Sequence, residues 1–412
     1  MLYPLTTMQN YFYEYQKKDP DSTMYNMYPM LMRLHDWIDL DRLADSILRV
    51  NEAHPAVESI IEEHNGVPMQ RYIPGLIARP SVERISEDEF MSQKDKLIQP
   101  FYPGEPMFRF RIFQTEKAKY LFSDTYHIVC DATSKCIYFY DLDNVYSGQN
   151  VDNDAWLTYL QEKEAEKSSP HYDESRKYFE AMYDPESCSR YPKPDFDMQY
   201  NREGELHVVS GISENELDVL RKCHLTRNEF FTTAALIATA LFNRKPSVMH
   251  TWFYHGRIKK EFRKVVGLLT HDMPAALHLE GMTLGKAFTS IRTQVKGGLK
   301  HIDYPYDLLD QKCHADEDLC VIYQGSLYDT PEDFSFVKEL LEIREKHSGA
   351  QNIFDIEILE NDGGIDLLFF YAAQRYKPET VEAYSEIFVR TARRLLEAAN
   401  NDELNKEVLA YV

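Results

Sequence analysis

The sequence lacks the short motifs that identify the common nucleotide-binding and hydrolytic enzymes. Its 412 residues contain no GxGxxG or GxxxxGK[ST] phosphate loop, no HExxH zinc motif and no GxSxG nucleophile elbow. Glycine is also scarce, with 16 residues, whereas loops that approach a phosphate closely depend on glycine. These absences direct the search toward acid–base chemistry or toward binding without catalysis.

Long apolar runs and paired cysteines are missing too. The longest near-apolar run, Thr232 to Phe242, has about half the length of a membrane span, and the start MLYPL lacks the features of a signal peptide. The six cysteines are scattered without a repeated CxxC spacing, and Cys313, His314 and Cys320 are not spaced like a zinc finger. We therefore expect a cytoplasmic protein with reduced thiols, no membrane contact and no metal site.

Positive charge is in short supply: 46 basic residues face 67 acidic ones, for a net charge of −21. This balance excludes a general nucleic-acid binder, which must neutralise phosphates. One segment, 244–264, runs against it with seven basic residues and the single acidic Glu261. Arg292, Lys296 and Lys300 then recur at a four-residue spacing, on one helical stripe. Both sets suit either a solvated face or contact with an acidic partner or a phosphate.

What is present is a mixed pattern of helices and strands in both halves. The pattern predicts helices near 40–54, 136–145, 213–223, 228–242, 330–347 and 378–400, and strands near 107–113, 119–129, 249–254, 353–359 and 365–371. Residues 149–205 are polar and carry several prolines, which is typical of a crossover with one or two short helices. We predict an α/β protein with an N-terminal lobe, 1–165, a linker, 166–205, and a C-terminal lobe, 206–412.

The segment Tyr126–Ser134 holds the residues best suited to chemistry. His127 follows a predicted strand and precedes a loop of small residues, and Asp131 stands four positions later. A histidine at a strand end can face a cavity and move a proton, while a nearby aspartate usually has a structural role. By itself this pairing is found more often in structural than in catalytic sites.

The same segment resembles the HHxxxDGxS motif of condensation domains of nonribosomal peptide synthetases, in the chloramphenicol-acetyltransferase-like superfamily. His127, Asp131 and Ser134 match this motif, whereas Tyr126 replaces its first His and Ala132 replaces its Gly. Further matches follow in order along nearly the whole chain. They are Tyr3-Pro4-Leu5-Thr6 with Gln9, Tyr25-Asn26-Met27, Tyr146-Ser147-Gly148, His255-Gly256-Arg257, Val266–Pro274 and His301–Asp307.

The resemblance implies two α/β lobes in a V-shaped pseudo-dimer with a central tunnel, and His127 at the tunnel's midpoint. It implies amide formation between a carrier-bound thioester and an acceptor amine. Donor and acceptor carrier proteins, or neighbouring synthetase domains, would be the partners, with substrates on phosphopantetheine arms and no bound cofactor. His127 would orient or deprotonate the amine, and the following loop would stabilise the oxyanion through backbone N–H groups.

The departures from the family pattern set expectations for single residues. The family pairs the motif aspartate with an arginine of a later block, but no arginine lies between Leu309 and Thr330. Asp131 therefore lacks this partner or recruits another, such as Arg257. Ala132 suits the position of the glycine if its φ is negative. Tyr126 is expected to be packed, Ser134 to cap the loop or touch substrate, and His271 to lie in the tunnel or in an exposed loop.

Three functions remain compatible with these residues. The first is the amide-forming acyltransferase, with Lys259 and Lys260 as carrier contacts beside Arg257 and His271. The second is a condensation-like platform that binds without turnover, which the altered motif favours. The third is a stand-alone acyltransferase that uses coenzyme A, although the DFGWG motif of such enzymes is absent.

Overall fold

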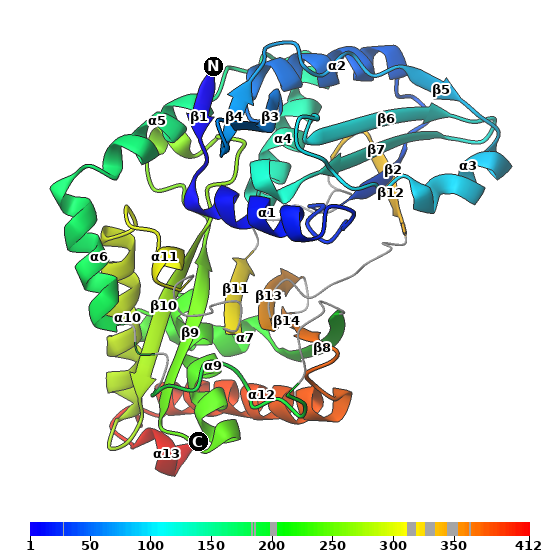
Figure 1. Cartoon of the computed structure of the whole chain (residues 1–412). Coiled ribbons are helices and arrows are strands. Elements are labelled where there is room, and N and C mark those ends of the chain that lie inside the picture. The colour runs from blue at the N-terminus through cyan, green and yellow to red at the C-terminus, as the bar shows by residue number, and fades with distance from the viewer. Residues whose placement is uncertain are drawn as a thin grey trace. The chain divides into compact units, whose positions relative to one another are not determined.

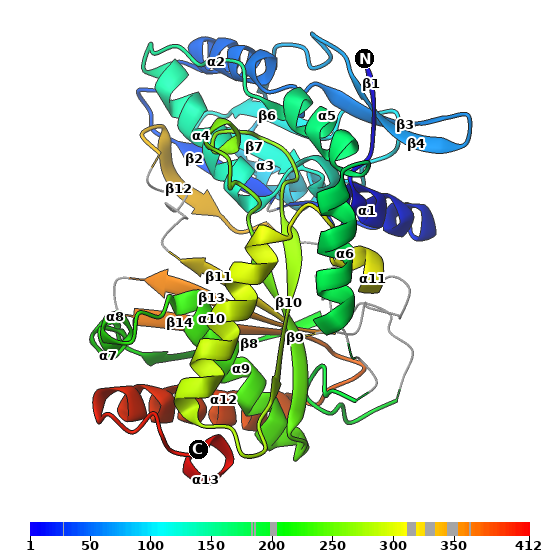
Figure 2. The same cartoon turned by 90° about the vertical axis from the view of Figure 1, so that its left-hand side faces the viewer.

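The computed structural model describes residues 1–27, 29–182, 184, 187–197, 204–310, 319–325, 334–343, 353–361 and 364–412. They form two compact α/β units (Figures 1 and 2). Unit 1 is Met1–Glu166 with two later segments, His255–Thr270 and Tyr328–His347, and unit 2 is Lys167–Tyr254, His271–Leu327 and Ser348–Val412. The predicted α/β class is confirmed. The prediction assigned all of 206–412 to the second lobe, whereas the chain returns twice to unit 1.

Unit 1 contains a five-stranded sheet in the order β12-β2-β7-β6-β5 and a three-stranded sheet in the order β1-β4-β3. Its strands are β1 (Leu2–Pro4), β2 (Met30–Leu34), β3 (Ser59–His64), β4 (Val67–Tyr72), β5 (Val82–Arg84), β6 (Phe108–Gln114), β7 (Lys119–Thr125) and β12 (Val337–Leu341). Its helices are α1 (Thr7–Lys18), α2 (Leu40–Ala53), α3 (Glu87–Gln93), α4 (Ala132–Tyr146) and α5 (Trp156–Glu166), with the 3-10 turns η1 (Lys94–Lys96), η2 (His127–Val129) and η3 (Lys260–Phe262).

The period-two pattern of its strands gives the five-stranded sheet two apolar faces. Met32 pairs with Leu121, and both belong to the core formed with α2 and α4. The next pair, Leu31 and Phe122, belongs to a second core with Phe90 of α3. Because successive side chains of a strand point to opposite faces, α2 and α4 cover one face and α3 covers the other.

Helix α2 begins and ends as its sequence predicts. The Asp39 carboxylate accepts the backbone N–H groups of Asp41 and Arg42, which have no partner within the helix. His54 ends the helix. The apolar stripe of Leu43, Ile47 and Val50 is fully buried, since these positions lie on one face at helical spacing.

Unit 2 is a six-stranded sheet in the order β10-β9-β11-β13-β14-β8. Its strands are β8 (Gly204–Ile212), β9 (Ser247–Tyr254), β10 (His271–His278), β11 (Leu319–Gly325), β13 (Phe354–Asn361) and β14 (Gly364–Ala372). Its helices are α6 (Pro170–Met182), α7 (Glu214–Leu217), α8 (Val219–Lys222), α9 (Arg227–Asn243), α10 (Leu284–Lys300), α11 (Asp307–Asp310), α12 (Pro378–Asn400) and α13 (Val408–Tyr411). The buried faces of α9, α10 and α12 share one apolar core with the sheet.

Several unit 2 predictions are confirmed. The strands predicted near 353–359 and 365–371 form β13 and β14, which pair antiparallel with Phe354 opposite Tyr371 and Asn361 opposite Gly364. Helix α12 begins at Pro378, where a proline costs no helical hydrogen bond. The apolar segment near 228–242 forms α9, and Thr226 with Glu229 makes a capping box at its start.

Other predicted elements are wrong in type or extent. The helix near 330–347 is contradicted where the structure describes it, because Val337–Leu341 forms β12 and pairs antiparallel with β2. Its predicted start at Thr330-Pro331 and its end at His347 lie outside the described residues. The pairing of an edge strand overrides local helix propensity here. The strand near 119–129 ends at Thr125, the helix near 136–145 begins at Ala132, and the helix near 213–223 is two short helices.

Two predictions concern absent features. No helix among the described residues has the length and apolar character needed to cross a membrane. Of the three residues weighed as a zinc site, Cys320 lies in β11, and Cys313 and His314 lie outside the described residues.

His250 in β9, in the core of unit 2, makes the stability of the folded protein depend on pH. It is fully buried, and neither ring nitrogen has a hydrogen-bond partner among the described residues. Burial lowers its pKa to about 3, so the folded protein keeps the ring neutral. The unfolded chain takes up a proton near pH 6.5, and stability is therefore lost as the pH falls below that value.

We expect His250→Leu to remove this contribution to acid sensitivity. In urea unfolding between pH 6.5 and 4.5, His250 should cost the wild type up to ~1.4 kcal/mol per pH unit. The variant should show a shallower decline, and His278→Leu, at an exposed histidine, should keep the wild-type slope. Identical slopes for wild type and His250→Leu would contradict this assignment.

Candidate functional site

The His-Asp segment of unit 1 forms a short connection between a strand and a helix. β7 ends at Thr125, η2 covers His127–Val129, and α4 begins at Ala132. Asp131 is the N-cap of α4, and its carboxylate accepts the backbone N–H of Ser134 at 2.8 Å. The cap determines where the helix starts, which explains why α4 begins before its apolar stretch.

Tyr126, at the position of the family's first histidine, is packed as predicted. Its side chain is 2% exposed, its hydroxyl donates to the backbone carbonyl of Phe12 at 3.4 Å, and its ring contacts that of Phe101. Its backbone N–H donates to Met107 at 2.9 Å. The side chain of Tyr126 therefore fills part of the apolar core next to the His127 turn.

His127 is held by its backbone and by one aromatic ring. Its N–H donates to the carbonyl of Tyr25 at 2.8 Å, and its imidazole stacks on the ring of Phe12 with centroids 4.4 Å apart and planes 19° apart. The residue is 8% exposed. Ring nitrogen Nδ1 is buried and has no hydrogen-bond partner among the described residues.

This environment keeps the imidazole of His127 neutral. Burial lowers its pKa below the ordinary value, and the negative charge of Asp131 opposes this effect only in part. A neutral imidazole has one nitrogen that accepts a proton. His127 is therefore in the state that a general base requires at neutral pH.

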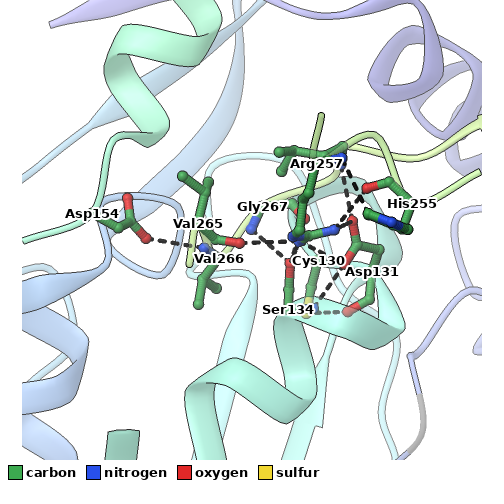
Figure 3. Close-up of polar contacts among 10 residues, drawn as sticks. Cys130, Asp131, Ser134, Asp154, His255, Arg257, Val265, Val266 and Gly267 are labelled. Carbon is green, nitrogen blue, oxygen red and sulfur yellow. Dashed lines mark hydrogen bonds and ion pairs between the residues drawn. The ribbon is translucent and has the colours of Figure 1, made fainter. Parts of the chain in front are cut away.

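Asp131 has a complete set of partners, and the strongest is Arg257 (Figure 3). The Nη1–H of its guanidinium donates to Oδ2 of Asp131 at 3.0 Å, and the Nη2–H donates to Oδ1 at 2.9 Å. The N–H of Leu269 donates to Oδ2 at 3.0 Å. Of the two possibilities that the sequence left for Asp131, recruitment of Arg257 is the one observed.

Arg257 is buried inside unit 1, with 4% of its surface exposed. Besides the carboxylate, its guanidinium donates to the carbonyl of His255 at 2.9 Å and to that of Val265 at 3.0 Å. The preceding Gly256 has φ +73°, and a Cβ there would lie 1.7 Å from the carbonyl oxygen of Leu269. The arginine therefore depends on a glycine to reach Asp131.

Ser134, in the first turn of α4, forms hydrogen bonds to the segment that carries Arg257 and Gly267. Its hydroxyl accepts from Arg257 at 2.7 Å and from the N–H of Gly267 at 2.9 Å, and donates to the carbonyl of Gly267 at 2.6 Å. A Cβ on Gly267 would lie 2.4 Å from the buried ring of Trp156. Ser134 thus has a structural role, and the residue that caps the start of α4 is Asp131.

A histidine between two carboxylates supports this arrangement. The N–H of Val266 donates to Asp154 at 3.0 Å. The same oxygen, Oδ2 of Asp154, lies 2.7 Å from Nδ1 of His54, and Nε2 of His54 lies 3.2 Å from Asp141. Hydrogen bonds to the two carboxylates raise the pKa of His54 against the effect of its burial.

Ala132 keeps the backbone that the family's glycine would supply. Its φ is not positive, since the only non-glycine residues with positive φ among those described are Asn65, His224, Arg244 and Asp402. It is the first residue of α4, where the backbone N–H groups have no partner within the helix. The replacement therefore introduces no backbone strain.

The remaining predicted residues lie elsewhere. His271 is the first residue of β10 in unit 2 and is 8% exposed, so the exposed-loop alternative is wrong. Lys259 and Lys260 are exposed at the start of η3, and Lys259 pairs with Glu162 of α5. Neither lysine contacts the Asp131–Arg257 pair.

The sequence did not single out Phe12 or Asp154 as parts of the site, and Tyr25 appeared only within the matched block Tyr25-Asn26-Met27. Phe12 lies one helical turn after Gln9 of the opening motif, and this spacing was the signal available for it. Within the described part of the chain, no three His, Cys, Asp or Glu side chains are grouped to hold a metal ion.

Replacing Arg257 should unfold unit 1 more easily. We expect Arg257→Met to lower the free energy of unfolding by about 3–5 kcal/mol, because it leaves the Asp131 carboxylate buried without its counter-ion. Arg263→Met, at an exposed arginine of the same segment, should change it by less than about 0.5 kcal/mol. Denaturant titration measures both values, and equal effects would contradict the central place of the pair.

Sequence comparison identifies relatives among large peptide synthetases. The chain is 24% identical over 434 residues to surfactin synthase subunit 2 of Bacillus subtilis (strain 168), and the match covers 97% of this chain and 12% of the relative. The chain thus spans about an eighth of the length of that relative.

Solved structures share the fold at low identity. The first condensation domain of the calcium-dependent antibiotic synthetase, in complex with a substrate analogue, matches with a TM-score of 0.75 at 16% identity, covering 99% of this chain and 98% of that one. The X-domain in its complex with OxyB from teicoplanin biosynthesis matches with a TM-score of 0.78 at 12% identity, covering 99% and 95%.

The family model described as "Condensation domain" matches residues 1–409. This range includes the His127 turn, the Asp131 cap and the segment that carries Arg257. Since the match extends over nearly the whole chain, the protein belongs to the condensation domain family.

Proposed function

We propose that this condensation domain forms amide bonds by transferring an acyl or peptidyl group from a carrier-bound thioester to an acceptor amine. The observation that carries the proposal is His127, a neutral buried histidine on a turn tied to the Asp131–Arg257 pair. Membership of the family supports the reaction class. The tunnel implied by the resemblance, with His271 in it, stays a prediction.

Amide formation requires a group that accepts one proton from the attacking amine. The amine nitrogen attacks the thioester carbonyl carbon, a C–N bond forms, and the C–S bond breaks to release the thiol. His127 takes the proton that the amine loses and returns it to the departing sulfur. The thioester supplies the driving force, so the step balances without a further reactant.

The start of α4 can stabilise the oxyanion in this reaction. Ala132 and Thr133 are its first two residues, with backbone N–H groups that no helical carbonyl accepts. A helix N-terminus favours negative charge. The guanidinium of Arg257, paired with Asp131, offsets the negative charge of the carboxylate next to these N–H groups.

The partners in this proposal are donor and acceptor carrier proteins or neighbouring synthetase domains, with substrates on phosphopantetheine arms. We assign a carrier contact to the exposed residues of 258–264. Lys259, Lys260, Arg263 and Lys264 are exposed there beside Ile258, which is 45% exposed. Phe262 anchors the segment by packing edge-on against Tyr159. The phosphate of the arm and acidic side chains complement these cations.

A second candidate function is a binding platform without turnover. The observation in its favour is the burial of His127, at 8% exposure, together with Tyr126 and Ala132 in the motif. A similar fold is present in the complex of the X-domain with OxyB. In this case the His127 turn would serve only the core.

Removing the imidazole separates the two candidates. With a panel of aminoacyl carriers as donors and acceptors, we expect His127→Gln to slow single-turnover amide formation by about 10²–10⁴-fold. His278→Gln, at an exposed histidine, serves as the control and should react like the wild type.

Other outcomes favour other functions. Equal rates in wild type and His127→Gln, or no product from wild type with any carrier pair, would favour the platform. Turnover and thermal stabilisation by acetyl-coenzyme A alone would favour the third candidate.

Charge reversal tests the carrier contact. We expect the double variant Lys259→Glu/Lys260→Glu to weaken binding of a phosphopantetheine-loaded carrier about tenfold, with a reduced salt dependence. Lys117→Glu, an exposed lysine of the β6–β7 turn, should bind as the wild type does. Unchanged affinity in calorimetry for the double variant would exclude this surface.

A further inference from the structure

Helix α1 touches the His127 turn through a buried glutamine. Gln9 is fully buried, and its Nε2 donates to the carbonyl of Ile128 at 3.0 Å and to Oε1 of Gln70 at 2.8 Å. Its own Oε1 accepts the N–H of Thr6 at 3.1 Å, within the capping box of α1. One side chain thus ties the start of α1, strand β4 and the 3-10 turn together.

The next turn of α1 brings Phe12 onto the imidazole. Its ring stacks on His127, and its carbonyl accepts the hydroxyl of Tyr126. Residues three positions apart share a helix face, which explains why Gln9 and Phe12 meet the same turn. Phe12 is 3% exposed, so the stack is a fixed part of the core.

We propose that Gln9 and Phe12 are positioning residues for His127, with Gln9 holding the backbone of the turn and Phe12 holding the plane of the ring. The inference rests on the proposed function and names residues that act through His127. A histidine ring is usually oriented by a hydrogen bond from its second nitrogen. Nδ1 of His127 has no such bond among the described residues, so the stacking contact takes this role.

The same contact excludes water from the imidazole. Burial is the largest cause of the lowered pKa of His127, and Phe12 supplies one whole face of that burial. Two effects follow from this contact: the imidazole stays neutral, and the plane of its ring is held parallel to the ring of Phe12. Both lower the cost of reaching the geometry for proton transfer.

The experiment is an NMR titration of the Hε1 proton of His127, assigned by its loss in His127→Gln. We expect Phe12→Leu to move the titration midpoint upward, toward the ordinary value of histidine, and to lower kcat about tenfold with little change in KM. Phe12→Tyr keeps the aromatic ring, so the titration midpoint and kcat should both stay at their wild-type values. Tyr13→Leu removes the neighbouring buried ring of α1, whose hydroxyl bonds to Glu63, and should change neither.

The role of Gln9 is tested by comparing its substitution with that of Gln70, to which it donates a hydrogen bond. We expect Gln9→Met to lower kcat at unchanged KM, whereas Gln70→Met leaves the bond from Gln9 to Ile128 and should keep wild-type kcat. An unchanged His127 titration in folded Phe12→Leu, or an equal shift in Tyr13→Leu, would overturn the proposal. The titration needs no turnover, so it distinguishes this failure from a failure of the proposed function.

Discussion

The buried ion pair between Asp131 and Arg257 is the interaction on which the candidate site depends. The aspartate caps α4, and the arginine comes from a segment more than a hundred residues later in the chain. Because both charges are buried, each must have the other, and loss of either leaves a charge in the core. The pair therefore fixes the start of the helix, the preceding His127 turn and the path of residues 255–270 together.

The surrounding packing makes this arrangement specific. Gly256 permits a backbone that no Cβ would allow, and Gly267 lies against the ring of Trp156. His54 and Asp154 hold Val266 from the other side. Buried ion pairs add little net stability compared with apolar packing. We infer that this one serves to define where the returning segment lies in unit 1.

The chemistry of His127 follows from the same burial. A buried imidazole stays neutral and able to accept a proton, and the stacked ring of Phe12 restrains the plane of the imidazole. The altered motif residues do not disturb this. Tyr126 fills the core below the turn, and Ala132 adopts the helical backbone that it prefers. The turn thus tolerates two departures from the family pattern, because Tyr126 is packed in the core and Ala132 introduces no backbone strain.

The sequence by itself determined the family resemblance, the α/β class, the start of the last long helix at Pro378 and the two strands near 353–359 and 365–371, and it predicted His127 and Asp131 as site residues. These depend on local patterns, where spacing and residue type carry the information. It also left Arg257 open as a partner of Asp131. Only the tertiary structure decided that pairing, the stack of Phe12 on His127 and the conversion of 337–341 into strand β12. Each joins residues far apart in the chain, and pairing or burial with a distant partner outweighed the local preference.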